Sequence, residues 1–330
     1  MASLLRSLRP TLLRPIMAAR YASFEAPLII SPAQLHQNFK ENQHVAILDT
    51  TWFMPNSPRK AYDEFQKRRL PGAQFLDLDK VASSHELGLK HMMPSAVQFA
   101  DACEKLGIQP STHVVLYDAH GVFSSPRALF MFRNLGHSNS SILNGGLPRW
   151  DAKSFPIDTN PPSSPPSKSQ YPPPALDQNA IRSYEQMVTN SALNPSSSLE
   201  AELVIDARSA GRFTGEDPEP RPGLSSGHIP NSFSLPFNLF LKTEQGSQGS
   251  TYTVFREADE IRTELDNAVG AAQAERIIKG EATAVTTCGS GMTAGVIWLG
   301  LKLLGAPKLS LYDESWTGYA MRPTSRIEMA

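Results

Sequence analysis

One succession of strands and helices occurs twice along this 330-residue chain, and that repetition constrains the fold more than any other feature. In the first half, short apolar segments alternate with amphipathic ones. This alternation predicts an α/β fold with a mainly parallel sheet. The expected strands are Val45–Asp49, Ala73–Asp79, His113–Asp118 and Ser141–Asn144, and the expected helices are Tyr62–Arg69, Ala96–Leu106 and Pro126–Leu135.

The second half repeats this order. Leu203–Asp206, Gly227–Leu235, Val285–Leu304 and Ser310–Asp313 correspond to segments of the first half. The repeat is about one domain long, which indicates duplication of a domain and excludes a solenoid. A Pro/Ser-rich stretch separates the copies and predicts an extended linker. The expected divisions are a first domain at 24–152, a linker at 153–176 and a second domain at 177–330.

A single cysteine stands at the most distinctive place of the second copy. Cys288 follows the predicted strand Ala284–Thr287, and Gly289-Ser290-Gly291 leads from it to an apolar helix at Val296–Leu304. A glycine-rich loop before a helix directs several N–H groups at one point, which favours a thiolate there. A lone cysteine is more often a buried structural residue, but this arrangement favours a nucleophile.

The first copy has Asp118 where the second has Cys288. A carboxylate cannot act as a sulfur nucleophile, so we expect the first domain to be a scaffold and the second to be catalytic. The segment Cys288-Gly-Ser-Gly-Met-Thr-Ala294 resembles the active loop of the 3-mercaptopyruvate sulfurtransferases, which are two-domain rhodaneses. The resemblance extends from about Ile30 to the C-terminus, and it implies two tandem rhodanese-like domains. It implies substrate contacts at Gly289, Gly291, Met292 and Thr293, and Thr293 is also expected to cap the following helix.

The loop residues separate three kinds of cysteine chemistry. Cysteine phosphatases need an arginine where this chain has Ala294. In the related rhodaneses that prefer thiosulfate, basic residues directly follow the cysteine. In this chain the corresponding residues, Gly289 and Ser290, are neutral. A neutral loop suits 3-mercaptopyruvate, whose thiol reacts while its carboxylate lies further away. A thiosulfate-preferring rhodanese and a non-enzymatic persulfide carrier or interaction module remain alternatives.

The carboxylate of 3-mercaptopyruvate, the expected sulfur donor, requires a cationic partner. The segment Gly211–Arg221 supplies two arginines, Arg212 and Arg221. By resemblance these two match the family's carboxylate-binding arginines. The family is also held to use a serine, a histidine and an aspartate as a proton relay. The matching residues are Ser290, His91 and Asp79, with His85 as an alternative histidine because the intervening loop is about one residue longer here.

The expected reaction passes sulfur through a Cys288 persulfide to a thiol such as thioredoxin or glutathione, or to cyanide, and releases pyruvate. No metal or organic cofactor is implied. Basic and acidic residues nearly balance, 31 against 32, which gives no reason to expect nucleic acid as a partner. No apolar run approaches a membrane span. Cys103 is expected to be structural, and two cysteines form no disulfide framework, which fits a reducing compartment.

The segment Met1–Ser23 has the composition of a mitochondrial transit peptide. Four arginines are interleaved with leucines and serines, and the first acidic residue is Glu25. We therefore expect a mitochondrial matrix protein. A cytoplasmic form that begins at Met17 is left open.

Overall fold

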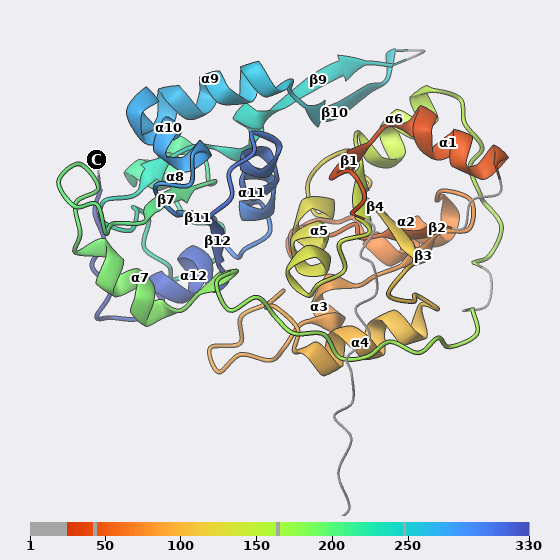
Figure 1. Cartoon of the computed structure of the whole chain (residues 1–330), viewed down its shortest axis with the longest axis horizontal. Helices are drawn as coiled ribbons and strands as arrows, with labels where there is room; N and C mark the ends of the chain where they lie inside the picture. The colour runs from red at the N-terminus through yellow and green to blue at the C-terminus, as the bar shows by residue number, and fades with distance from the viewer. Residues whose placement is uncertain (1–24, 42–44, 163–165, 247–248, 330) are drawn as a thin grey trace, which may run out of the picture.

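The computed structural model describes residues 25–41, 45–162, 166–246 and 249–329, so the predicted transit peptide lies outside the described residues. Two halves of similar design lie beside each other (Figure 1). The elements of the first half are β1 Ile29–Ile30, α1 Pro32–Lys40, β2 Val45–Asp49, α2 Ala61–Lys67, β3 Gln74–Phe75, α3 Leu78–Val81, α4 Ala96–Lys105, β4 His113–Tyr117, α5 Ser125–Asn134, β5 Ser140–Leu143 and α6 Gly146–Ala152.

The second half follows the same plan with one addition, an antiparallel pair of strands formed by β9 and β10. Its elements are β6 Ile181–Arg182, α7 Tyr184–Ser191, β7 Leu203–Asp206, α8 Ala210–Thr214, β8 Phe233–Ser234, the 3₁₀ helix η1 Phe237–Phe240, β9 Leu241–Gln245, β10 Thr251–Phe255, α9 Ala258–Val269, α10 Ala271–Ile278, β11 Ala284–Thr287, α11 Ala294–Leu303, β12 Leu309–Tyr312 and α12 Ser315–Ala320.

Each half contains a parallel five-stranded sheet among the described residues. The strand order is β1-β5-β4-β2-β3 in the first half and β6-β12-β11-β7-β8 in the second. The two orders are equivalent, so the predicted duplication and the predicted α/β fold are confirmed. β4 and β11 are the middle strands, and the segments that follow them lie at the carboxyl edge of each sheet, where α/β proteins bind ligands.

Local sequence signals explain several helix starts. Ser31, Ser95 and Ser183 each accept a hydrogen bond from the backbone N–H three residues later, and the glutamine at that position bonds back to the cap. This reciprocal capping box pairs two N–H groups that would otherwise lack partners. Pro32, the residue after the Ser31 cap, is the first helical residue of α1.

One predicted strand is much shorter than expected. Ala73–Asp79 was expected to be extended, but only β3 pairs with β2, and α3 begins at Leu78. The Asp77 carboxylate accepts hydrogen bonds from the N–H groups of Asp79 and Lys80, at 3.1 and 3.2 Å. This N-cap starts a helix within the expected strand, and it places Asp79 on a helical turn.

The two halves pack closely through α5 and α11, which face each other at the centre of Figure 1. A Cβ atom on Gly295 would lie 2.8 Å from the backbone nitrogen of Arg127, so only glycine permits the two helices to approach this closely. Further along the helices, the Phe130 and Trp298 rings meet edge to face at 5.2 Å. One apolar core therefore includes residues of both halves.

The predicted linker packs against the first half. No helix or strand occurs in its described part, but Asp158 bonds to Arg69 through both backbone and side chain, and the Tyr171 hydroxyl lies 2.9 Å from His137 Nδ1. The hairpin of β9 and β10 also reaches the first half, where Phe255 N–H donates to Asn144 Oδ1 at 3.0 Å. None of the described helices combines the length and apolar character needed to cross a membrane.

Candidate active site

Cys288 directly follows the middle strand of the second sheet. Its N–H donates to Ser315 Oγ at 3.2 Å, and its carbonyl accepts from the Trp316 N–H at 2.9 Å. The Gly289 carbonyl accepts from both the N–H and the hydroxyl of Thr317. These bonds hold the loop against α12. The Cys288 side chain is only 2% exposed, so bulk water has little access to the thiol.

The loop after Cys288 has backbone donors without acceptors. Within the described residues, the N–H groups of Ser290, Gly291, Met292, Thr293 and Ala294 have no acceptor. Gly291 has a φ of +83°, which favours glycine. Such a series of free N–H groups at the start of a helix forms a site for an anion.

The first half shows how this kind of loop holds a negative charge. Asp118 Oδ2 accepts from the N–H groups of Phe123, Ser124 and Ser125 at 2.9 to 3.1 Å, and from Ser125 Oγ at 2.7 Å. Its Oδ1 accepts from the His120 N–H at 2.9 Å. The carboxylate fills the anion site of its own loop. In the second half the equivalent residue is a thiol, and the donors stay free.

Both predicted arginines lie beside this loop. An ideal Cβ on Gly289 would lie 3.0 Å from Arg212 Nη2 and 3.4 Å from Arg221 Nη1. Burial lowers the pKa of the Arg221 guanidinium, and the negative charge of a thiolate at Cys288 opposes that shift. The structure therefore brings together the thiol, the free N–H groups and the two guanidinium groups.

The two arginines differ in their partners. Arg212 donates from Nε and Nη2 to the two oxygens of Glu219, at 3.0 and 2.5 Å. Arg221 has no ion pair or hydrogen-bond partner in the described part of the chain. The guanidinium that is free to receive a carboxylate is therefore that of Arg221.

Sequence reasoning missed a third arginine that supports the other two. Arg208 is buried, donates to Asp206 and Glu219, and lies with its Cζ 4.2 Å above the Trp316 ring. The sequence did contain a signal for Arg208. This residue lies two positions after β7, which ends at the same edge of the sheet as the strand before Cys288. Trp316 is buried in this packing, and its Nε1 donates to the Ser225 carbonyl.

Asp79 and His91 meet in a short hydrogen bond between Oδ1 and Nδ1. Trp52 Nε1 donates to the other Asp79 oxygen at 3.1 Å. Partial burial raises the pKa of Asp79, but the hydrogen bond and charge of His91 outweigh it, so the pKa lies below its ordinary value. His85, the alternative histidine, lies instead 3.7 Å from Glu314.

His91 is 3% exposed, and its Nε2 is buried with no hydrogen-bond partner among the described atoms. Its φ is +54°, an uncommon value for a residue other than glycine. Arg127 fixes this backbone because its Nη2 donates at 2.6 Å both to the His91 carbonyl and to Asp313 Oδ1. Asp313 also accepts from the Met93 N–H at 2.7 Å. The second domain thus holds the first-domain histidine in place.

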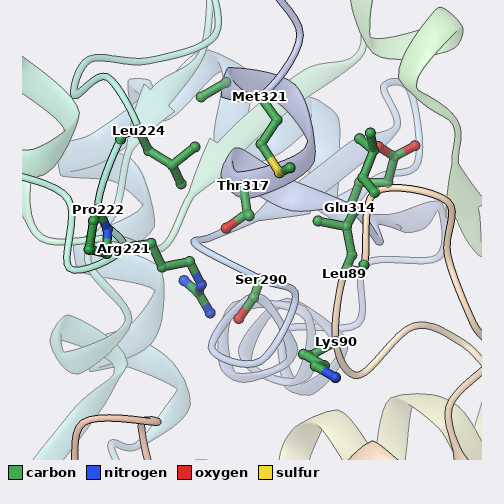
Figure 2. A pocket seen from close by; sticks show the side chains of 13 residues that line it. Leu89, Lys90, Arg221, Pro222, Leu224, Ser290, Glu314, Thr317 and Met321 are labelled. Atoms are coloured by element: carbon green, nitrogen blue, oxygen red, sulfur yellow. The ribbon is translucent and has the colours of Figure 1, made fainter.

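A cavity of about 480 Å³ opens where the two domains meet (Figure 2). The loop Leu87–Lys90 of the first domain forms one wall, and the segment Arg221–Leu224 with parts of α12 forms another. The Arg221 guanidinium extends toward Ser290 in Figure 2. Cys288 and His91 are not wall residues, and the structure contains no hydrogen bond between Ser290 and His91 among the residues described.

The remaining predicted positions lie as follows. Met292 is buried in the core and does not line the cavity. Thr293 is the N-cap residue of α11, as predicted, but its side chain makes no capping hydrogen bond, because its backbone angles are already helical. Cys103 is 1% exposed, and burial raises the pKa of its thiol, which agrees with the predicted structural role. No group of three or more potential metal-ligating side chains occurs in the described residues.

Comparison with known proteins gives consistent results. The family model for the rhodanese-like domain matches residues 31–153 and 190–322. The chain is 36% identical to 3-mercaptopyruvate sulfurtransferase of Rattus norvegicus over 95% of this chain and 94% of that protein. It is 32% identical to the mitochondrial thiosulfate/3-mercaptopyruvate sulfurtransferase 1 of Arabidopsis thaliana, over 91% of this chain and 78% of that protein.

A solved structure agrees with these relatives. The sulfur transferase subunit of yeast mitochondrial complex I superposes with a TM-score of 0.76 at 30% identity, over 92% of this chain and all of that one.

Proposed function

Because this chain belongs to the rhodanese family and is a sulfurtransferase, we propose that it transfers the sulfur of 3-mercaptopyruvate through a persulfide on Cys288. The observation that carries the proposal is the neutral loop after Cys288. Among the described residues, its N–H groups have no acceptor, and they lie beside Arg221, which has no ion pair there. This arrangement offers a thiol, a site for the negative charge of the persulfide, and a cation for the donor's carboxylate.

In the first half-reaction, the Cys288 thiolate attacks the sulfur of the donor. The carbon–sulfur bond breaks, its electron pair stays on carbon, and the three-carbon fragment leaves as the enolate of pyruvate. Arg221 pairs with the carboxylate throughout, because a guanidinium presents two donors to its two oxygens. The loop N–H groups stabilise the persulfide anion as it forms, which is electrostatic stabilisation of the kind an oxyanion hole provides.

The enolate needs a proton, and Ser290 with His91 and Asp79 is the proposed source. The Asp79 bond to Nδ1 directs His91 Nε2 away from Asp79, and that atom has no other partner among the described ones. Ser290 is the member that reaches the cavity. Because the buried Nε2 bonds to no other group, it remains available for proton transfer.

In the second half-reaction, a thiolate or cyanide removes the outer sulfur, and Cys288 leaves as a thiolate. Thioredoxin and glutathione are the proposed thiol acceptors. The mitochondrial matrix is the proposed location, supported by the basic N-terminal segment and by mitochondrial proteins among the relatives. A cytoplasmic form remains a further proposal that rests on Met17 alone.

The test compares donors with purified protein. Wild type should release pyruvate from 3-mercaptopyruvate faster than it consumes thiosulfate, and mass spectrometry should find one added sulfur on Cys288. Cys288→Ser should lose both signals, whereas Cys103→Ser should keep them. An unchanged rate in Cys288→Ser would exclude the persulfide.

A second variant tests the carboxylate contact. Arg221→Met should raise the KM for 3-mercaptopyruvate about 10-fold to 100-fold, the effect of a lost charge-assisted hydrogen bond of roughly 1.5–3 kcal/mol. Thiosulfate lacks a carboxylate, so its KM should change less.

The thiosulfate-preferring alternative is supported by relatives whose names include thiosulfate, such as the one in Arabidopsis thaliana. Faster turnover of thiosulfate than of 3-mercaptopyruvate would select it.

A further inference from the structure

The cavity is larger than the proposed donor requires. Pockets of roughly 300–1,000 Å³ hold drug-sized ligands, and this one measures about 480 Å³. A three-carbon keto acid whose carboxylate pairs with Arg221 would fill only a fraction of this volume. We call the part of the cavity beside the first-domain loop Leu87–Lys90 and α12 its outer part. It is therefore a place where a second small molecule can approach the persulfide.

The charged groups that line the cavity are Lys90, Arg221 and Glu314. The carboxylate charge of Glu314 already has partners, because Arg322 makes a short hydrogen bond to its Oε2 and His85 Nε2 lies 3.7 Å from its Oε1. Lys90 and Arg221 make no ion pair with any described residue, so the unpaired charges of the wall are both positive. The cavity as a whole favours anions.

The two cations occupy different sides of the cavity. In Figure 2, Ser290 lies between Arg221, from the catalytic domain, and Lys90, from the first domain. Arg221 adjoins Gly289 and hence the reacting loop. Lys90 is exposed and makes no ion pair in the described part of the chain. Asp79, an acid on the neighbouring helix α3, is not its partner, because the two Asp79 oxygens already bond to His91 and Trp52. Lys90 thus offers its ammonium group to a ligand in the outer part.

We propose that Lys90 selects the acceptor: it pairs with the carboxylate of a small anionic thiol that enters the outer part of the cavity after the donor fragment has left. This inference rests on the proposed function, since it concerns the second half-reaction. The acceptor thiolate attacks the outer sulfur of the Cys288 persulfide. The sulfur–sulfur bond breaks, Cys288 leaves as a thiolate, and the acceptor carries away a persulfide, so no other oxidant or reductant is needed.

The experiment compares three acceptors that differ in charge: 3-mercaptopropionate, 2-mercaptoethanol and cysteamine, at saturating 3-mercaptopyruvate. The variants are Lys90→Met, which keeps the apolar stem, and Lys90→Glu, which reverses the charge. Lys153→Met is the matched control, because that lysine is exposed and lies outside the cavity.

Lys90→Met should raise the KM for 3-mercaptopropionate about threefold to fivefold, the upper end of the range for a solvent-exposed ion pair, and leave the KM for 2-mercaptoethanol within twofold. Lys90→Glu should reverse the preference so that cysteamine becomes the better acceptor. Added salt should reduce these differences because the site is exposed. The control should behave as wild type.

The first half-reaction separates this inference from the proposed function. Lys90→Met should give the wild-type burst of pyruvate and the same added sulfur on Cys288. A normal burst with equal KM changes for all three acceptors would overturn the role of Lys90. A raised KM for 3-mercaptopyruvate would also overturn it and assign Lys90 to the donor. A wild type without a burst would reject the proposed function, and the inference with it.

Discussion

Asp118 and Cys288 occupy equivalent positions at the ends of the middle strands of two sheets with the same strand order. The Asp118 carboxylate is fully buried and accepts five hydrogen bonds from its own loop. The N–H groups of the loop after Cys288 have no acceptor within the described part of the chain. One loop design therefore forms a closed anion site in the first domain and an open one in the second.

Asp118→Asn should destabilise the protein by about 2–3 kcal/mol. The amide NH₂ cannot accept hydrogen bonds, so N–H groups now bonded to the carboxylate lose their acceptor. The measurement is the free energy of unfolding in urea. The control is Asp101→Asn, because Asp101 is exposed. If both variants were equally stable, the carboxylate would contribute nothing to the loop.

Asp79→Asn should lower kcat about 100-fold with 3-mercaptopyruvate. The bond from Asp79 sets which nitrogen of His91 carries the proton, and general acid–base groups contribute roughly 10²–10⁴ to a rate. Pyruvate release measured against pH is the readout. His85→Asn is the matched control, since His85 lies near Glu314 instead. A loss in His85→Asn with normal Asp79→Asn would transfer the role to His85.

Arg127→Met should weaken both stability and catalysis. Arg127 and Asp313 form a buried ion pair between the domains, and removing one partner of such a pair costs roughly 3–5 kcal/mol. Because Arg127 also bonds the His91 carbonyl, kcat should fall further than the loss of folded protein explains. Unfolding followed by calorimetry and by tryptophan fluorescence gives the fraction of folded variant. The kcat per folded molecule then separates the effect on catalysis from the effect on stability. Wild-type kcat in the folded variant would show that His91 is positioned without Arg127.

The sequence predicted those features that depend on local pattern. The strand before Cys288 has its predicted bounds, and the loop after it lies beside both predicted arginines. The contacts that bind the domains together were not predictable, because Arg127 and Asp313 are 186 residues apart and neither belongs to a recognised motif. Asp79 was assigned to a strand for a different reason: apolar alternation at 73–79 hid the cap at Asp77.

The pH dependence of stability offers a test that is independent of catalysis. Burial, aided by the nearby Asp118 charge, raises the pKa of Asp49 to about 6 from 3.8, against the opposing hydrogen bonds from Thr51 and Tyr117. An acid with a raised pKa in the folded state stabilises the fold most when it is protonated. Its contribution is full below about pH 4, falls as the pH rises to about 6, and costs about 3 kcal/mol above that.

Asp49→Asn removes this titration, while its amide oxygen can still accept the Thr51 hydrogen bonds. The unfolding free energy of the variant minus that of wild type should therefore increase by about 3 kcal/mol between pH 4 and 6, and then stay constant. Urea unfolding at several pH values gives this difference directly. Groups shared by both proteins, including Asp79 with its lowered pKa, cancel in the subtraction. A difference that did not change with pH would mean that Asp49 is ionised in the folded protein at its ordinary pKa.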